Sequence, residues 1–260
     1  MKEVADFIKH WLIEYLENSN QQGFVVGISG GVDSALCGSL CALTGKSVLL
    51  VNLPLRQNIE QYQRASLQIR HLESHFKNVK STEIDLSHVF STIENTLPNE
   101  VSSHSLAMAN TRSRLRMLTL YALAQSSGFL VVGTGNKVED FGIGFFTKYG
   151  DGGVDLSPIA DLTKSQVFKM AGFLEVIPEI LMAKPTDGLW GDERTDEDQI
   201  GATYPELEWA MEFSGDELKL NFREKKVLEI YRKFNTINRH KMVSIPVCQV
   251  PESMKKNIDV

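Results

Sequence analysis

The chain is organised around residues 23–35, which read GFVVGISGGVDSA. The apolar run FVVG at 24–27 is too short for a helix and is bounded by glycine, so it predicts a buried strand. Residues 29–31 (SGG) then permit a tight turn, and Asp33 and Ser34 are typical of the start of a helix. A glycine-rich turn into a helix N-terminus presents free N–H groups and the positive end of the helix dipole. The stretch therefore predicts a phosphate site.

The spacing of these glycines excludes two common phosphate loops. A Walker A loop needs lysine after its last glycine, whereas Val32 follows Gly31, and the dinucleotide fingerprint G-x-G-x-x-G does not fit either. The sequence SGGVDS at 29–34 instead resembles the loop of the ATP pyrophosphatase superfamily, whose members split ATP into AMP and pyrophosphate while they activate a carboxyl or carbonyl group. The alternative is a turn whose glycines serve packing alone. Two hydroxyls and a carboxylate at the helix start favour the phosphate site.

Length and composition limit the classes of protein to consider. A chain of 260 residues can form one large domain, and we expect a single domain over residues 1–260. The net charge of −6 comes from interspersed acids and bases, which gives no footprint for nucleic acid. No apolar run approaches the roughly 20 residues that span a membrane. Without a signal-peptide core or metal-type cysteine spacing, we expect a cytoplasmic protein with reduced cysteines and no membrane contact.

Strand-like and helix-like segments alternate along the first half of the chain. Strands are expected near residues 24–27, 47–53, 79–86 and 129–133, and helices over 2–18, up to about 43, 58–76 and 105–126. Strands joined by helical crossovers form a parallel sheet with helices on both faces. We therefore expect an α/β fold, a three-layer sandwich with about five parallel strands. The superfamily resemblance makes it adenine nucleotide alpha hydrolase-like.

The second half has fewer clear elements. A capping box at residues 163–166 predicts a helix to about Leu174, with further cap signals at 195–198 and 214–217 and a last helix over 223–238. Residues 133–157 contain seven glycines among charged side chains, which predicts an active-site loop rather than a core element. A linker between two domains is the alternative. Asp33 and Glu139 follow strands that would end at the same edge of the sheet, so they are the candidate magnesium ligands.

Several segments together resemble the ammonia-dependent NAD synthetase family. Beyond the loop, they are NTRSRLRM at 110–117, GTGNKVE at 133–139, FTKYGDGGVD at 146–155, LTK at 162–164, KPT at 184–186 and HK at 240–241. The match runs from the first helix nearly to the C-terminus. It implies that the protein adenylates the nicotinate carboxylate of nicotinic acid adenine dinucleotide (deamido-NAD), releases pyrophosphate, and lets ammonia displace AMP.

The resemblance also implies roles for individual residues. Asp33 and Glu139 would bind Mg²⁺, Lys164 would stabilise charge during adenylation, and Asp151 would bind or deprotonate ammonium. The implied ATP-binding residues are Gly27, Ile28, Ser29, Gly30, Gly31, Val32, Asp33, Ser34, Thr134, Lys164 and Thr186. Those implied for deamido-NAD are Arg114, Lys148, Asp155, His240 and Lys241. The interval from Glu139 to Lys148 is one residue longer than in some relatives, which puts the place of Lys148 in question.

The resemblance further implies a homodimer with the dinucleotide site at the subunit interface. Relatives that use glutamine carry a glutaminase domain with a nucleophilic cysteine. No room precedes the first helix for such a domain, so we expect free ammonia as the nitrogen source. Two alternatives remain open. The protein could be another adenylating amidotransferase or a tRNA-modifying ATP pyrophosphatase, or it could be a nucleotide-binding sensor without catalysis.

Overall fold

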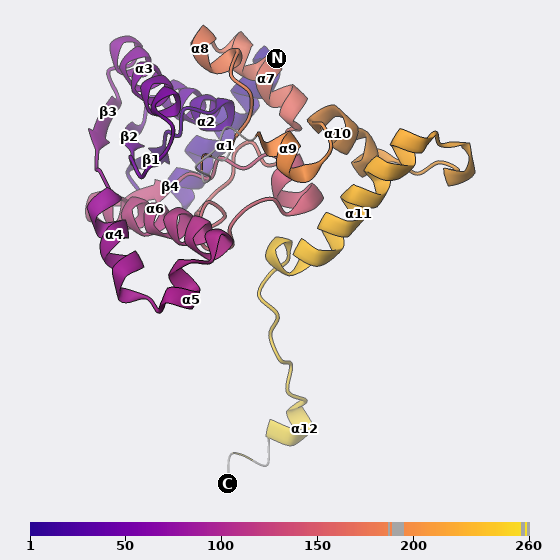
Figure 1. The fold of residues 1–260 in the computed structure, drawn as a ribbon. Coiled ribbons are helices and arrows are strands. Elements are labelled where there is room, and N and C mark those ends of the chain that lie inside the picture. Colours follow the sequence, from indigo (N-terminus) through magenta and orange to yellow (C-terminus); the bar gives the residue numbers. More distant parts are fainter. Residues whose placement is uncertain (187, 189–194, 256–257, 259–260) are drawn as a thin grey trace.

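The structure is a computed model, and it describes all residues except 187, 189–194, 256–257 and 259–260. Within the described residues, four parallel strands form one sheet in the order β3-β2-β1-β4 (Figure 1). They are β1 (Gly23–Gly27), β2 (Ser47–Asn52), β3 (Val79–Glu83) and β4 (Phe129–Val131). Val25 lies opposite both Leu49 and Val131, which places β1 in the interior of the sheet.

A fifth strand is only partly formed. The expected sheet had about five strands, but beyond β4 the structure has a single parallel bridge between Val132 and Leu156. Pro158 follows two residues after this bridge and has no N–H to donate, so the ladder cannot extend. The α/β sandwich with a parallel sheet is thus confirmed, with four strands and one bridge.

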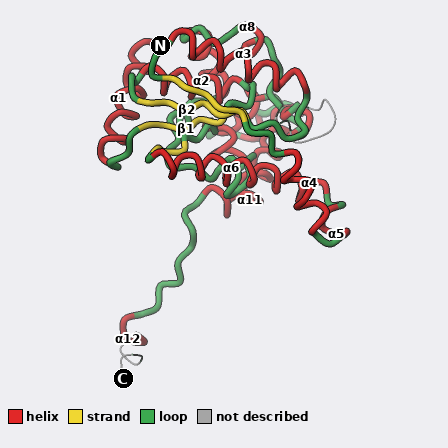
Figure 2. Tube along the Cα trace, turned by 90° about the vertical axis from the view of Figure 1, so that its left-hand side faces the viewer, coloured by secondary structure: helices red, strands yellow, loops and turns green. Residues whose placement is uncertain are grey.

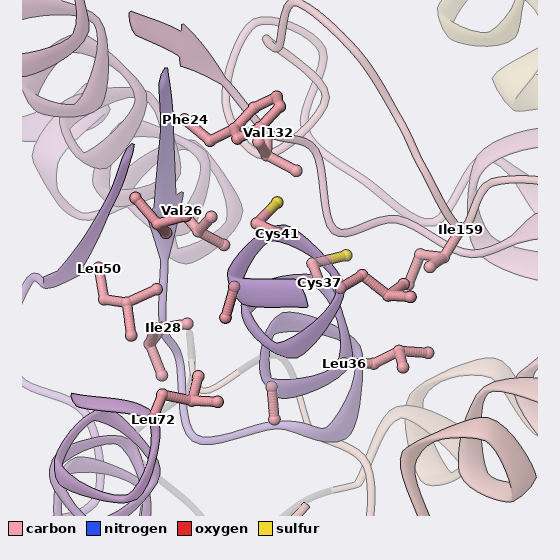
Figure 3. Close-up of a cluster of buried hydrophobic side chains, with 14 of the residues drawn as sticks. Phe24, Val26, Ile28, Leu36, Cys37, Cys41, Leu50, Leu72, Val132 and Ile159 are labelled. Atoms are coloured by element: carbon pink, nitrogen blue, oxygen red, sulfur yellow. The ribbon is translucent and has the colours of Figure 1, made fainter. Parts of the chain in front are cut away.

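Alternate residues of β1 pack on opposite faces of the sheet, and this alternation makes the three layers. Phe24 and Val26 are buried against α1 (Lys2–Asn18) and α2 (Val32–Leu43), together with α3 (Ile59–His75). Figure 3 shows this cluster, with Cys37 of α2 among its side chains.

The other face of the sheet carries the third layer. Val25 packs with residues of α4 (Ser87–Thr96) and α6 (Ser105–Ser127), which include Phe90. Because a strand that is buried on both sides cannot shift in register without exposing apolar side chains, β1 holds the start of α2 in a fixed position.

A third hydrophobic cluster lies outside the sandwich. It joins the π-helical turn η1 (Val138–Ile143) to α10 (Tyr204–Glu212) and α11 (Phe222–Met242), and Val138 and Ile143 are fully buried in it. The prediction that residues 133–157 contain no core element is therefore wrong for 138–143. Val138 and Ile143, at the two ends of one wide turn, are buried, whereas Phe141 between them is exposed.

The remaining helices are short or lie between and beyond these parts. They are α5 (Asn99–Ser102), α7 (Lys164–Phe173), α8 (Pro178–Leu181), α9 (Asp196–Ile200), the 3₁₀ turn η2 (Glu217–Lys219) and α12 (Glu252–Lys255). The capping boxes predicted at 163–166 and 195–198 are confirmed at the starts of α7 and α9. The cap signal at 214–217 is wrong by two positions, because the Asp216 side chain caps η2.

The C-terminal part extends away from the body. Beyond α11 the chain is extended as far as α12, a short helix that the sequence did not indicate (Figures 1 and 2). In the described part of the chain, no helix combines the length and apolar character needed to cross a bilayer.

Candidate active site

The loop between β1 and α2 is shaped by its own residues. The Ser29 amide donates to Ser34 Oγ (3.1 Å), the Gly31 amide donates to Ser29 Oγ (3.2 Å), and Ser34 Oγ donates to the Gly31 carbonyl (3.0 Å). Gly30 adopts a φ of +84°, and a Cβ there would lie 2.3 Å from the carbonyl oxygen of Gln61. Only glycine fits this position.

The N-terminus of α2 is left open by this loop. Gly31 is the N-cap residue, and no described side chain caps the helix. Its first-turn N–H groups therefore lack helical partners and can bind ligand oxygens, with the helix dipole favouring an anion. The phosphate site expected from the sequence has the backbone geometry that it requires.

Three charged side chains from different elements meet beside this loop. Lys164 Nζ lies 2.6 Å from Asp33 Oδ2 and 3.1 Å from Glu139 Oε1. Asp33 is in the first turn of α2, Glu139 is in η1, and Lys164 begins α7. The structure thus brings together the two residues predicted as metal ligands and the lysine predicted to act in catalysis.

Burial and charge oppose each other in this cluster. Burial alone would lower the pKa of Lys164, but the attraction of Asp33 and Glu139 outweighs it, so the pKa is raised above its usual value. For Glu139, burial raises the pKa, and Lys164 counteracts that shift. A lysine in the first turn of a helix is unfavourable near the positive dipole end. The two carboxylates compensate for that position and keep the ammonium charged.

Three further residues hold the cluster, and none of them was among the predicted site residues. Asn136 Nδ2 donates to Asp33 Oδ1 (3.1 Å), and its Oδ1 accepts from the Glu139 amide (3.2 Å). The Tyr204 hydroxyl donates to Glu139 Oε1 at 2.5 Å, and it also lies 3.3 Å from Asp196 Oδ2. Asn136 stands in the GTGNKVE segment, but Tyr204 and Asp196 stand in segments with cap signals alone. No spacing rule connects them to Glu139.

Asp151 occupies a second polar pocket of the same region. Ser113 Oγ donates to its Oδ1 at 2.7 Å, and the Thr147 amide donates to the same oxygen at 2.9 Å. Asp151 as a residue is exposed to solvent, but the protein that surrounds its carboxyl partly desolvates that group and raises its pKa, while these two hydrogen bonds partly counteract the shift. A carboxylate with a raised pKa is a better proton acceptor, so the environment suits the predicted role.

Asp140 is an additional acid in this region. Burial, together with repulsion from Glu139, raises its pKa to about 8. Its carboxyl fills the space beside Gly135, where a Cβ would lie about 2 Å from its oxygens. This contact gives Gly135 a packing role.

The residues predicted to bind deamido-NAD form a cationic group, with one exception. Arg114 Nε donates to the Lys148 carbonyl (3.3 Å), Lys148 Nζ to the His240 carbonyl (2.8 Å), and Lys241 Nζ to the Phe146 carbonyl (2.8 Å). The wide turn η1 takes up one residue more than an α-helical turn, so Lys148 reaches the others despite the longer interval.

Asp155 stands apart from the other predicted residues. Its carboxylate accepts hydrogen bonds from the Tyr121 hydroxyl (3.0 Å) and from the Val131 amide (2.8 Å). Asp155 does not line the cleft that contains the other predicted residues. In the described structure it therefore holds the end of β4 against α6.

One cleft of about 710 Å³ connects these parts. Such a volume is typical of a small-molecule site. The predicted residues that line it are Gly27, Ile28, Ser29, Gly30, Gly31, Val32, Asp33, Ser34, Arg114, Thr134, Glu139, Lys148, Asp151, Lys164, Thr186, His240 and Lys241. Arg116 lines it as well, and it donates to the Leu53 carbonyl at 3.2 Å. Arg112 instead lies over the Phe90 ring.

The carboxylates of the cleft are few, which fits a metal ion that takes its other ligands from phosphate. In the described residues, no group of three or more His, Cys, Asp or Glu side chains could hold a metal. Asp33 and Glu139 are two carboxylates that both contact Lys164 Nζ. Magnesium is usually bound by one or two carboxylates with phosphate oxygens and water, so a pair is sufficient.

A family model and individual relatives of known name agree on one family for this chain. The family model described as NAD synthase matches residues 4–244. The chain is 37% identical to the NH(3)-dependent NAD(+) synthetase of Finegoldia magna, over 79% of this chain and 82% of that protein. It is 36% identical to the enzyme of the same name from Alkaliphilus metalliredigens, over 91% and 94% of the two chains.

Solved structures extend the similarity to the fold. The structure of NMN synthetase from Francisella tularensis superimposes with a TM-score of 0.84 at 31% identity, and covers 96% of this chain and 98% of that chain. A glutamine-dependent NAD+ synthetase from Acinetobacter baumannii has the same fold, with a TM-score of 0.65 at 21% identity. This chain covers 47% of it.

Proposed function

The chain belongs to the NAD synthase family of ATP-dependent ligases, and from this premise we propose that it amidates deamido-NAD with ammonia to give NAD. ATP would be converted to AMP and pyrophosphate, through an acyl-adenylate. One observation supports this proposal above the others. The open N-terminus of α2, the Lys164 cluster and Asp151 line a single cleft, so a phosphate site, a cation and a proton acceptor can act on one substrate.

The first step forms the acyl-adenylate. The nicotinate carboxylate attacks the α-phosphorus of ATP, the bond to the β,γ-phosphates breaks, and pyrophosphate leaves. The N–H groups of α2 hold the phosphate oxygens, and Lys164 neutralises the charge that develops on them. Asp33 and Glu139 would hold Mg²⁺, which shields the negative charge of the pyrophosphate when it is bound.

The second step forms the amide. The nitrogen of ammonia attacks the carbonyl carbon, the bond from that carbon to the AMP oxygen breaks, and AMP leaves. At neutral pH ammonia is mostly protonated, so a group must accept a proton before or during the attack. Asp151 serves as that acceptor, because its raised pKa makes it more basic than an ordinary aspartate.

The cations of the cleft would bind the phosphates of the acceptor. Arg114 and Lys148 offer donors for phosphate oxygens beside Lys241 and His240. Arg114 is exposed, so this end of the site is open on one side. We propose that a second copy of the chain completes it. Sedimentation at working concentration should give a dimer, and a monomer would contradict this part of the proposal.

The compartment and domain organisation are proposed on the same basis. All three cysteines are free thiols, and Cys37 and Cys41 are buried, which suits a reducing compartment such as the cytoplasm. Residues 1–260 would act as one catalytic unit that takes free ammonia.

A second acceptor, nicotinic acid mononucleotide, is supported by the similarity to the Francisella tularensis NMN synthetase structure. Both acceptors carry the same nicotinate carboxylate, and they differ in the AMP half of the dinucleotide. The residues that surround the reacting carboxylate would therefore serve either acceptor.

The test supplies ATP, Mg²⁺ and a nitrogen source to the protein with each acceptor in turn, and detects the products by mass. The proposal predicts equal amounts of AMP, pyrophosphate and NAD from deamido-NAD with ammonium, and much less product with glutamine. Faster turnover of the mononucleotide would favour the second acceptor. Turnover of neither would support another amidotransferase, a tRNA-modifying enzyme or a sensor, and would overturn the proposal.

A further inference from the structure

Tyr204 has contacts that the two steps above leave unexplained. It lies in the first turn of α10 and is only 3% exposed. Its hydroxyl donates to Glu139 Oε1 and lies beside Asp196 Oδ2, while Lys164 Nζ sits 4.8 Å from the centre of its ring. One side chain thus touches both an acid and the lysine of the charged cluster. Its aromatic ring packs in the third hydrophobic cluster with Leu207, so its position is fixed from behind.

The two oxygens of Glu139 are in different environments. Oε1 accepts from both Tyr204 and Lys164. Oε2 accepts from no residue within the described ranges. The hydrogen bonds to Oε1 therefore orient the carboxylate so that Oε2 is the oxygen available to a ligand.

We propose that Tyr204 is a positioning residue for the cation that accompanies ATP. Its hydroxyl holds Glu139 Oε1 so that Oε2 faces the metal, and its ring restrains the Lys164 ammonium. This inference rests on the proposed function only in taking Glu139 as a ligand of Mg²⁺. Groups that hydrogen-bond to metal-binding carboxylates commonly change metal affinity by about 10- to 100-fold.

Loss of the hydroxyl would free the carboxylate to rotate. Lys164 would then be the sole described donor to the Glu139 carboxylate, and either carboxylate oxygen could turn toward it. The ammonium and the metal would compete for the same oxygens. The expected result is weaker binding of Mg²⁺ with ATP, and little change for ATP without metal.

The experiment measures ATP binding to the full chain by calorimetry, with and without Mg²⁺, in wild type and Tyr204→Phe. No acceptor is present, so the result does not depend on turnover. We expect the enhancement of ATP affinity by Mg²⁺ to fall about 10-fold in the variant, with metal-free affinity within twofold of wild type. Tyr62→Phe is the matched control, because the Tyr62 hydroxyl also donates to a glutamate, Glu83, at 3.2 Å outside the cleft.

A double variant tests whether the effect passes through Glu139. Glu139→Gln alone should weaken the Mg²⁺ enhancement, and adding Tyr204→Phe should change it no further, because the two side chains act as one unit. An unchanged enhancement in Tyr204→Phe would overturn the inference. Equal losses with and without metal would also overturn it, since they indicate a general structural role. If wild-type protein binds ATP with Mg²⁺ but makes no amide, the proposed function fails while this inference stands.

Discussion

The loop at residues 28–34 and the cluster around Lys164 line the same cleft, yet they are built in opposite ways. Apart from Asp33, which belongs to the cluster, the loop is made from backbone groups and two hydroxyls, and its internal hydrogen bonds join residues at most five positions apart. The cluster is made from side chains, and the bond between Lys164 and Asp33 joins residues 131 positions apart.

This difference determines how each part can fail. A loop defined by backbone geometry tolerates no added atoms at a tightly packed glycine, but the hydrogen bonds that shape it join uncharged groups, so no charge has to be balanced. A buried cluster of charges tolerates changes of shape, but it depends on charge balance, because removing one partner leaves another uncompensated. The predictions below test each property in turn.

Loss of the lysine should have the largest effect. Lys164→Met keeps an unbranched side chain but removes the charge, leaving the half-buried carboxylates of Asp33 and Glu139 without a cation between them. We expect AMP formation to slow by on the order of 10³-fold, the range seen when one group that stabilises transition-state charge is removed. The measurement is the initial rate of AMP release by chromatography. Lys137→Met is the control, since Lys137 pairs with Asp161 at the surface, and it should retain wild-type turnover. A rate for Lys164→Met within a few-fold of wild type would contradict the role of the cluster.

The loop should be sensitive to a single carbon atom. Gly30→Ala places a Cβ 2.3 Å from the Gln61 carbonyl and adds strain at a positive φ, so we expect a loss of roughly 2–4 kcal/mol in the free energy of unfolding. Chemical denaturation measures it. Gly45→Ala is the matched control, because Gly45 also has a positive φ, +72°, but nothing lies within 4 Å of its added Cβ. That variant should lose about 1 kcal/mol, from strain alone. Equal losses at both positions would show that the close approach at Gly30 is unimportant.

Asp140, the acid beside the Lys164 cluster, should make the free energy of unfolding depend on pH. The pKa of Asp140 is about 8 in the folded protein and about 3.9 in an unfolded chain, so folding binds a proton between these values. Wild-type stability therefore falls as pH rises through that window. Asp140→Asn removes this titrating carboxyl, and we expect the variant to be more stable than wild type by on the order of 5 kcal/mol at pH 8.5, and by about 1 kcal/mol or less at pH 4.5.

The measurement for Asp140 is denaturation in magnesium-free buffer at both pH values. A stability difference that does not change with pH would contradict the burial argument.

The surface link between α10 and α11 should give the smallest effect. The guanidinium of Arg223 donates two hydrogen bonds to Glu206, from Nε to Oε1 and from Nη2 to Oε2, each 2.6 Å long. These bonds lower the pKa of Glu206 to about 2. Arg223→Gln should lower the free energy of unfolding only slightly at pH 7, because the solvent screens an exposed ion pair. The contribution is complete above the unfolded pKa of about 4.3 and disappears as pH falls toward 2. Urea denaturation at pH 7 and pH 2.5 tests it, and a cost that is unchanged at pH 2.5 would exclude the ion pair as its source.

Sequence patterns predicted the parts of the fold that short-range rules determine. The expected family is confirmed, as are the parallel sheet and the capping boxes at Thr163 and Thr195. The wide turn η1 and the short α10 were missed because their stability comes from packing in the third cluster rather than from local periodicity. Asn136 and Tyr204 could not be placed for a similar reason, since hydrogen bonds across the fold leave no spacing in the chain.

The central claim is that the acceptor carboxylate is activated as an acyl-adenylate in this cleft, and an isotope experiment tests it most directly. The protein is given ATP, ammonium and deamido-NAD whose nicotinate carboxylate carries ¹⁸O in both positions. The account predicts one ¹⁸O in the AMP, one in the amide and none in the pyrophosphate, because the carboxylate oxygen that attacks the α-phosphorus stays with it. Label in pyrophosphate or inorganic phosphate, or AMP without label, would contradict it.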